Sequence, residues 1–138
     1  MVIGYLPMTA DLFHVGHINA ILKANKLCDK LYIGLLTDKA IKKYKGQLPV
    51  IPESQRQCML ITMLNTFGYS IIMQGSINPF KNLKKWKADI LFSGDGFTEE
   101  EQKAAEKLGI ALCEFPYHEG QSTTKIKQRV IKQNYGRK

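Results

Sequence analysis

The sequence predicts an α/β fold: a parallel sheet of about five strands with helices on both faces, in a single domain spanning residues 1–138. Three observations carry this prediction. Short apolar runs alternate with longer segments of helical hydrophobic spacing, which is the pattern of strand–helix–strand units. No internal repeat or linker interrupts the alternation. A chain of 138 residues has the length of one domain and is long enough to bury a sizeable core.

The first half of the chain supplies two strands and two helices. Residues 2–6 and 31–36 are short apolar runs that suit buried strands of a parallel sheet. Residues 15–28 predict a helix, because apolar side chains recur there at helical spacing, at Ile18, Ile21 and Leu22. Residues 46–52 indicate an exposed loop, since they contain Gly46, Pro49 and Pro52. Pro52 also suits the first turn of a helix that continues to about residue 65.

The second half completes the sheet. Further strands are predicted over 70–73, 88–93 and 110–115. A helix is predicted over 99–108, because Gly109 follows in a position that ends many helices, and a last helix over 122–132. Ligands of parallel sheets bind outside the carboxyl ends of the strands. The junctions at that edge hold the distinctive residues of the sequence, and they are 7–17, 37–45, 94–97 and 117–124.

The composition limits the partners and the compartment. A formal net charge of +8 implies affinity for anions, which at this point could be nucleic acid, a membrane surface or a phosphorylated ligand. The three cysteines stand far apart and form no C-x-x-C pair, so each is expected to be a small buried hydrophobe in a reducing compartment. No apolar run approaches the ~20 residues of a membrane span, and no export signal is evident. We therefore expect a cytoplasmic protein without a membrane span.

The first junction carries an H-x-G-H pattern. His14 and His17 lie three positions apart and share one side of a helix that begins near His14. Gly16 has no side chain, so a ligand can approach the backbone closely. Two imidazoles beside a helix N-terminus can hold a phosphate and stabilise charge that develops on it. Half of a metal site is the alternative, but no further ligand has suitable spacing.

The last junction provides a second phosphate cradle. Gly120 allows a tight turn, and three hydroxyl side chains follow at the start of the last predicted helix, namely Ser122, Thr123 and Thr124. Lys125 adds positive charge. An ordinary helix cap is the alternative interpretation of this segment.

Together these two segments resemble the cytidylyltransferase-like branch of the nucleotidyltransferase superfamily, which has an H-x-G-H motif after its first strand and an R-T-E-G-x-S-T-T type motif before its last helix. The resemblance extends from about residue 3 to residue 130. It is closest to glycerol-3-phosphate cytidylyltransferases and to the cytidylyltransferase domains of phosphonate biosynthesis. The second group is nearer in the segments 8–11, 17–19, 34–41, 44–45 and 116–117.

The resemblance implies a Rossmann-like fold, dependence on Mg²⁺ and a homodimer. It implies that an acceptor phosphate or phosphonate attacks the α-phosphorus of CTP and releases pyrophosphate, with no covalent enzyme intermediate. Such an acceptor is already an anion near neutral pH, so catalysis becomes positioning and electrostatic stabilisation, without a general base. Glycerol 3-phosphate and 2-hydroxyethylphosphonate are examples of the expected acceptor.

The resemblance also assigns roles to residues. The catalytic residues are His14 and His17, on the triphosphate and the transition state, and Lys45, which reaches the α-phosphate as part of the loop that contains Gly46 and Pro49. Asp11 orients a histidine or assists Mg²⁺, and Asp95 recognises the nucleoside. Ser122 and Thr123 hold the β- and γ-phosphates. The remaining predicted nucleotide-binding residues are Thr9, Ala10, Gly16, Arg56, Gly94 and Thr124, of which Arg56 is expected to bind a phosphate or to form a surface salt bridge.

Four positions depart from the family pattern. Met8 replaces a glycine, Gly96 replaces the second acid of G-D-D-W, and Phe97 replaces its tryptophan. Tyr117 replaces the arginine of R-T-E-G, which puts the nucleotide or acceptor preference in question.

Two alternative functions follow from the same residues. One is adenylyl transfer to a phosphorylated cofactor precursor, because nucleotide choice depends on backbone contacts that a sequence shows poorly. The other is a non-catalytic RNA- or nucleotide-binding module that uses the positive charge. The aromatic residues are scattered instead of regularly spaced, so no nucleic acid partner is expected.

Overall fold

The computed structural model describes residues 1–115 and 123–135, and for residues 64–67, 134 and 135 it describes the backbone only. The strands are β1 (Ile3–Met8), β2 (Lys30–Leu36), β3 (Tyr69–Gln74), β4 (Ile90–Ser93) and β5 (Ala111–Glu114). The helices are α1 (Val15–Lys26), α2 (Asp38–Lys45), α3 (Glu53–Phe67), α4 (Phe80–Lys85), α5 (Glu99–Leu108) and α6 (Thr123–Tyr135).

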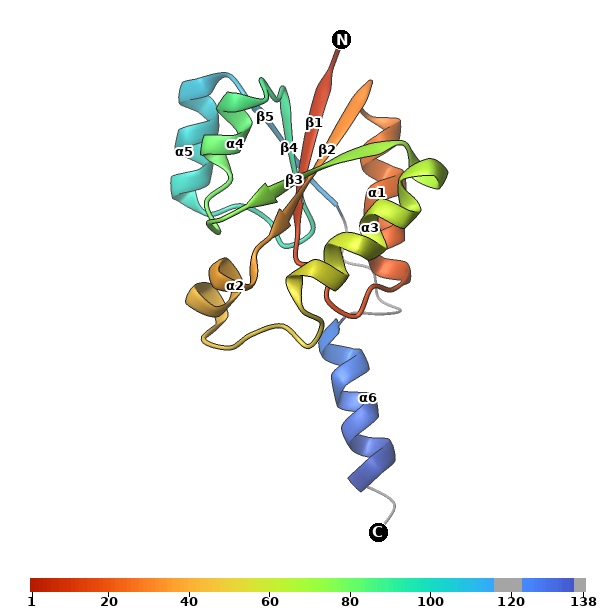
Figure 1. Ribbon diagram of the computed structural model, residues 1–138. Coiled ribbons are helices and arrows are strands. Elements are labelled where there is room, and N and C mark those ends of the chain that lie inside the picture. Colours follow the sequence, from red (N-terminus) through yellow and green to blue (C-terminus); the bar gives the residue numbers. More distant parts are fainter. Residues whose placement is uncertain (116–122, 136–138) are drawn as a thin grey trace.

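The five strands form one parallel sheet in the order β3-β2-β1-β4-β5 (Figure 1). The chain moves outward from β1 to β2 and β3, then returns to the other side of β1 for β4 and β5. The strand order therefore reverses between β1 and β4, the place where open parallel sheets bind ligands. The predicted α/β architecture is confirmed.

Helices cover both faces because successive residues of each strand point to opposite sides. On one face, Leu6 and Ile33 pack with Ile21 of α1 and Leu60 of α3. On the other face, Tyr5, Tyr32 and Leu91 pack with residues of α4 and α5, which are Phe80, Leu83 and Ala105. Helix α6 projects away from the sheet (Figure 1).

Two short helices, α2 and α4, were not expected from the hydrophobic pattern. For α2 the local signals are present in the sequence. The Thr37 hydroxyl accepts a hydrogen bond from the Ala40 amide at 3.1 Å, and Gly46 ends the helix with a φ of 80°. The prediction that Lys45 lies on the Gly46/Pro49 loop was therefore wrong, because Lys45 is the last residue of α2 and the loop begins after it.

The cysteine expectation was partly wrong. Cys28 and Cys113 are partly buried, as a small hydrophobe would be, but Cys58 is exposed on α3. No helix in the described part of the chain is long and apolar enough to cross a membrane.

Candidate active site

The segment between β1 and α1 has an unusual backbone. Ala10 and Leu12 have positive φ angles of 55° and 50°, a region that costs a side-chain-bearing residue roughly 1–2 kcal/mol. Residues 9–13, hereafter the β1–α1 turn, lead directly to the two histidines. Such a turn persists only where the surrounding contacts hold it in place.

His14 and His17 cap the start of α1 with their ring nitrogens. The Nδ1 atom of His14 accepts a hydrogen bond from the Gly16 amide, and Nδ1 of His17 accepts one from the His14 amide, each at 3.0 Å. Because Nδ1 accepts in both rings, each neutral imidazole carries its proton on Nε2. The ring centroids lie 4.0 Å apart. The motif thus presents two Nε2–H donors beside a helix N-terminus.

Burial and, to a lesser extent, the neighbouring His14 lower the pKa of His17 to about 4, whereas Asp11 opposes the shift. The ring is therefore neutral at pH 7, and it acts as a hydrogen-bond donor instead of a cation. Phe13 stacks on this ring at 5.2 Å between centroids, which fixes its orientation.

The start of α6 meets this pair. The Thr123 hydroxyl donates to the Asp11 carbonyl at 2.7 Å and lies 3.4 Å from Nε2 of His14. Thr123 therefore joins two segments that are 109 residues apart, as the prediction of a shared site requires. Thr124 follows it in the first turn of α6. Ser122, also predicted for this site, lies outside the described residues, as do Tyr117 and Gly120.

Asp11 serves the protein backbone. Its carboxylate oxygens accept hydrogen bonds from the Val50 and Ile51 amides, each at 2.9 Å, and one oxygen lies 3.8 Å from the Lys127 ammonium. The residue is only 4% exposed. Both oxygens thus hold the loop before α3, and the role of Asp11 toward Mg²⁺ stays a prediction. Among the described residues, no group of three or more His, Cys, Asp or Glu could hold a metal ion.

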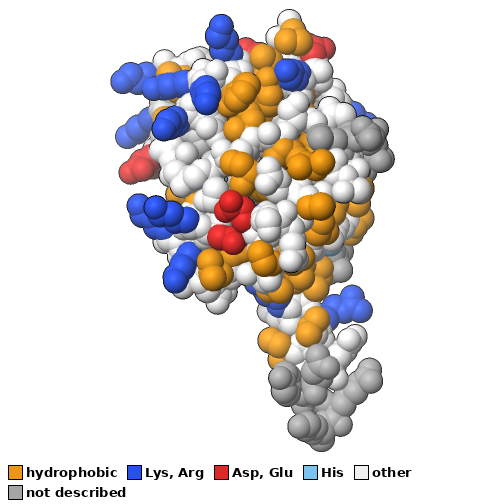
Figure 2. Space-filling model, in the orientation of Figure 1, with side chains coloured by type: hydrophobic (Ala, Val, Ile, Leu, Met, Phe, Trp, Pro, Cys, Tyr) orange, Lys and Arg blue, Asp and Glu red, His pale blue; other side chains and the backbone are white. Residues whose placement is uncertain are grey.

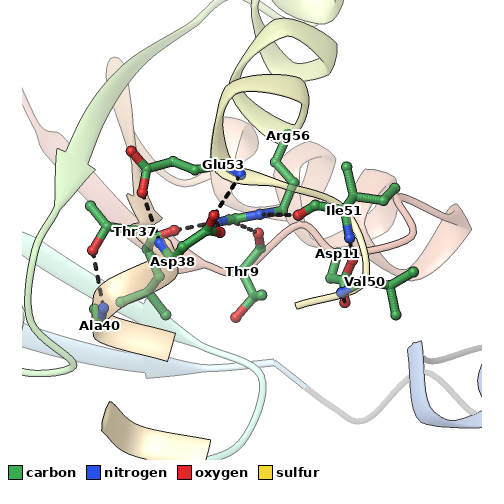
Figure 3. A network of polar contacts seen from close by, with 10 residues as sticks. Thr9, Asp11, Thr37, Asp38, Ala40, Val50, Ile51, Glu53 and Arg56 are labelled. Atoms are coloured by element: carbon green, nitrogen blue, oxygen red, sulfur yellow. Dashed lines mark hydrogen bonds and ion pairs between the residues drawn. The ribbon is translucent and has the colours of Figure 1, made fainter. Parts of the chain in front are cut away.

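Arg56 also differs from its prediction. It is completely buried, and its guanidinium donates to the carbonyls of Thr9, Leu36 and Ile51 and to Asp38 (Figure 3). The Asp38 contact, at 2.7 Å, is an ion pair. Neither a phosphate contact nor a surface salt bridge describes this residue, because burial and these four hydrogen bonds direct its donors to the chain itself.

A cavity of about 470 Å³ opens at the same edge and reaches Thr9 in the β1–α1 turn. β1 and β4 pair only at Gly4 and Tyr5, so the two strands separate toward their carboxyl ends. The space is lined by β1 and the turn after it, by α2, and by the loops that follow β3 and β4. The lining residues include Thr9, Lys45, Asn78, Gly94, Asp95 and Phe97. A cavity of this size suits a small molecule.

The predicted site residues therefore divide into two groups. Thr9, Lys45, Gly94 and Asp95 line the cavity. His14, Gly16, His17 and Thr123 surround the start of α1 and are not part of the cavity lining. Ala10 lies between the groups with its side chain buried. The β1–α1 turn joins them, because Thr9 faces the cavity and His14 begins the helix.

A second polar network supports the cavity wall and was not predicted. The Tyr5 hydroxyl donates to Gln74 Oε1 at 2.6 Å and accepts from Asn82 Nδ2 at 3.0 Å. Gln74 in turn donates to the Ser76 carbonyl at 2.8 Å, next to cavity residues 77–80. Gly34 makes room for this network, since a Cβ there would overlap the Tyr5 hydroxyl. A glycine inside an apolar strand was the available signal.

Positive charge gathers on two parts of the surface. Figure 2 shows lysine and arginine side chains over the side that carries α4 and α5 and over α2. The exposed lysines of α2 are Lys39, Lys42, Lys43 and Lys45, and those in and after α4 are Lys81, Lys84, Lys85 and Lys87. An anionic ligand that approaches the carboxyl edge is attracted by the lysines of α2, whereas Lys84, Lys85 and Lys87 lie toward the opposite edge, where the chain passes from α4 to β4.

The fold and this edge define the class: an α/β protein with a ligand-sized cavity at the reversal of strand order. Comparison with known proteins makes the class specific. The family model for cytidylyltransferase-like proteins matches residues 5–129, and the chain belongs to this family. The comparisons point to nucleotidyltransferase activity.

Curated relatives share much of this chain. It is 31% identical over 121 residues to the bifunctional protein HldE of Helicobacter pylori (strain P12), and 34% identical over 122 residues to HldE of Campylobacter jejuni subsp. doylei. Each alignment covers 87% of this chain and 26% of the relative. The chain thus spans about a quarter of the length of these relatives.

Solved structures agree on the fold. The lipopolysaccharide core biosynthesis protein from Thermoplasma volcanium GSS1 superposes with a TM-score of 0.71 at 26% identity, covering 86% of this chain and 99% of that one. A bifunctional NMN adenylyltransferase/ADP ribose pyrophosphatase from Francisella tularensis has a TM-score of 0.60 at 15% identity, covering 96% of this chain and 42% of that one. At that identity the second likeness concerns the fold alone.

Proposed function

We propose that this protein transfers CMP from CTP to a small acceptor that bears a phosphate or phosphonate, and releases pyrophosphate. The observation that carries the proposal is the pair of Nε2–H donors of His14 and His17, held by backbone amides at the start of α1. This arrangement is complementary to the oxygens of a triphosphate.

The reaction is a single displacement. An anionic oxygen of the acceptor forms a bond to the α-phosphorus of CTP, and the bond from that phosphorus to the oxygen bridging to the β-phosphate breaks. The bridging oxygen leaves with the pyrophosphate and takes the electron pair. His14 and His17 donate hydrogen bonds to the charge that develops on the phosphate oxygens, and the N-terminus of α1 adds to the stabilisation.

Lys45 and Asp95 are assigned to the cavity side of the reaction. Lys45, at the end of α2, offers an ammonium to the α-phosphate across the cavity that it lines. Asp95 and Gly94 follow β4 and line the same cavity, which supports a contact with the nucleoside. The triphosphate then extends from the cavity past Thr9 to the histidines, with Thr123 and Thr124 beside its far end.

Mg²⁺ belongs to the proposal as the ion that accompanies the triphosphate. The described residues do not form a protein cage for it, and Asp11 is engaged by backbone amides. Mg²⁺ is commonly held by substrate phosphates with few protein ligands, which is the arrangement proposed for this site.

The acceptor, the assembly and the location are also proposals. Glycerol 3-phosphate and 2-hydroxyethylphosphonate follow from the family resemblance, and a phosphorylated sugar follows from the similarity to a lipopolysaccharide core biosynthesis protein. We further propose a cytoplasmic homodimer that binds no nucleic acid.

The test is pyrophosphate release with Mg²⁺, in which CTP, ATP, GTP and UTP are each combined with these three classes of acceptor. Turnover with CTP and one acceptor supports the proposal. Turnover with ATP alone would replace it with adenylyl transfer. A folded protein that binds no nucleotide would contradict both and favour a non-catalytic role.

His17→Gln is the matched active-site variant for this assay. Glutamine can also accept the hydrogen bond from the His14 amide, so the start of α1 keeps its cap. We expect turnover to fall ~10²–10³-fold, the usual effect of removing one donor to the transition state. An unchanged rate constant in the folded variant would remove His17 from the catalytic residues.

A further inference from the structure

We propose that Arg56 is a positioning residue that holds the β1–α1 turn, and through it His14 and His17, against the loop that follows Lys45. The catalytic part of this inference rests on the proposed function, and the structural part does not. Arg56 is distant in sequence from every residue of the H-x-G-H motif, and its side chain is completely buried.

The contacts of Arg56 join three segments that meet at the carboxyl edge. Nη1 of Arg56 donates to the Thr9 carbonyl at 2.7 Å and to the Leu36 carbonyl at 2.8 Å. Nε donates to the Ile51 carbonyl at 2.9 Å, and Nη2 donates to Asp38 at 2.7 Å. The ends of β1 and β2 and the loop before α3 are thereby fastened to one rigid group (Figure 3).

The β1–α1 turn depends on this fastening. Its two positive φ angles, at Ala10 and Leu12, are unfavourable for residues with side chains. Arg56 binds the carbonyl just before the first of them, and Asp11, between them, accepts from the Val50 and Ile51 amides. The turn and the 46–52 loop therefore hold each other, and the position of His14 follows from both.

Arginine is the side chain that can make this set of contacts. It has five N–H donors in a fixed plane, of which four are used here, whereas lysine has three donors on one atom. A lysine at position 56 keeps the positive charge beside Asp38 but cannot reach three carbonyls in different directions. Arg56→Lys therefore tests the hydrogen-bond geometry of the guanidinium while the positive charge is kept.

Arg56→Lys is compared with Tyr69→Phe, a control at the opposite end of the sheet. The Tyr69 hydroxyl donates to the Leu60 carbonyl at 2.5 Å, and Tyr69 begins β3, far from the carboxyl edge. Both variants lose buried hydrogen bonds. We expect Arg56→Lys to lower kcat ~10–100-fold, as small misplacements of reacting groups do, while Tyr69→Phe leaves kcat within about twofold.

The imidazole ¹⁵N spectrum gives a readout that does not depend on activity. Wild-type protein at pH 7 should show His14 and His17 protonated on Nε2, with His118→Gln used to assign the third histidine. We expect Arg56→Lys to shift the His14 and His17 signals, and Tyr69→Phe to leave them in place. Unchanged signals in a folded Arg56→Lys protein would overturn the inference.

Asp38→Asn is the second variant if Arg56→Lys does not fold. It removes the charge that pairs with Nη2 of Arg56 but leaves Asp11 and the β1–α1 turn unchanged, so it loosens the guanidinium without touching the histidines. Shifted histidine signals in Asp38→Asn support the inference, and unshifted signals contradict it. If wild-type protein lacks turnover with every nucleotide, the proposed function fails, whereas the spectra still decide whether Arg56 positions the histidines.

Discussion

The two polar networks at the carboxyl edge of the sheet differ in charge and in what they join. The Arg56 network is ionic and connects loops, whereas the network of Tyr5, Gln74 and Asn82 is neutral and lies against the sheet. In the described part of the chain, no buried side-chain nitrogen or oxygen is left without a hydrogen-bond partner. Both networks are thus complete, although their chemistry is different.

The difference follows from the backbone that each network serves. Thr9, Leu36 and Ile51 present carbonyls where strands end and a loop runs, so several acceptors need a donor at one place. Guanidinium supplies several donors at once. Near Tyr5, the strands already pair with one another, and only a few side-chain groups remain to be satisfied. A hydroxyl and two amides are sufficient there, without the cost of burying a charge.

Arg56→Met should give the largest loss of stability and thus the strongest test of the difference between the two networks. This variant leaves the carbonyls of Thr9, Leu36 and Ile51 and the Asp38 carboxylate without the guanidinium. The loss of one partner of a buried pair typically costs ~3–5 kcal/mol, and we expect the lower end of this range because Asp38 is one-third exposed. Urea unfolding would measure the change in the free energy of unfolding. A loss below about 1 kcal/mol would mean that water or other groups replace the guanidinium, and that the two networks are equivalent.

The next prediction concerns the pH dependence of the free energy of unfolding, and it involves His17 and neither of the two networks. His17 has a pKa of about 4 when folded and 6.5 in its ordinary state, so between these values the unfolded chain binds more protons. The contribution of neutral His17 to the free energy of unfolding is fully present above pH 6.5. It decreases as the pH falls toward 4, and the total loss is about 3 kcal/mol. Unfolding free energies of wild type and His17→Gln across this range test the prediction. Parallel curves would contradict it.

Tyr5→Phe gives a smaller effect on the neutral network. Gln74 and Asn82 each lose one partner, which costs roughly 1–2 kcal/mol because the groups stay buried. Since the network borders cavity residues 77–80, we expect KM to rise more than kcat falls. Steady-state kinetics beside thermal unfolding separate these effects. A fall in kcat with constant KM would instead link Tyr5 to the reacting groups.

Lys45→Ala should change stability least. The side chain is exposed at the end of α2, so the free energy of unfolding should change by less than about 0.5 kcal/mol. Activity should fall clearly, because Lys45 lines the cavity and is assigned to the α-phosphate. A large drop in melting temperature with little loss of rate would show that Lys45 supports the fold and does not serve the ligand.

Much of the fold could be predicted because its signals are local. The helix over 99–108 was predicted with the bounds that the structure gives it, since Gly109 ends it with a φ of 69°. The His14-x-Gly-His17 motif marked the start of α1 for the same reason, because the two rings cap residues only two or three positions away. α2 and α4 were missed, since helices of eight and six residues carry too short a hydrophobic pattern.

The sequence by itself determined the alternating strands and helices, the family and the two segments that meet at Thr123. Only the tertiary structure decided the roles of Arg56 and Asp11, whose partners are backbone groups up to 47 residues away that carry no mark in the sequence. The cavity belongs to the tertiary structure as well, because it exists where β1 and β4 separate. Side-chain periodicity can be derived from the sequence. The direction of a carbonyl at the end of a strand depends on how distant segments pack.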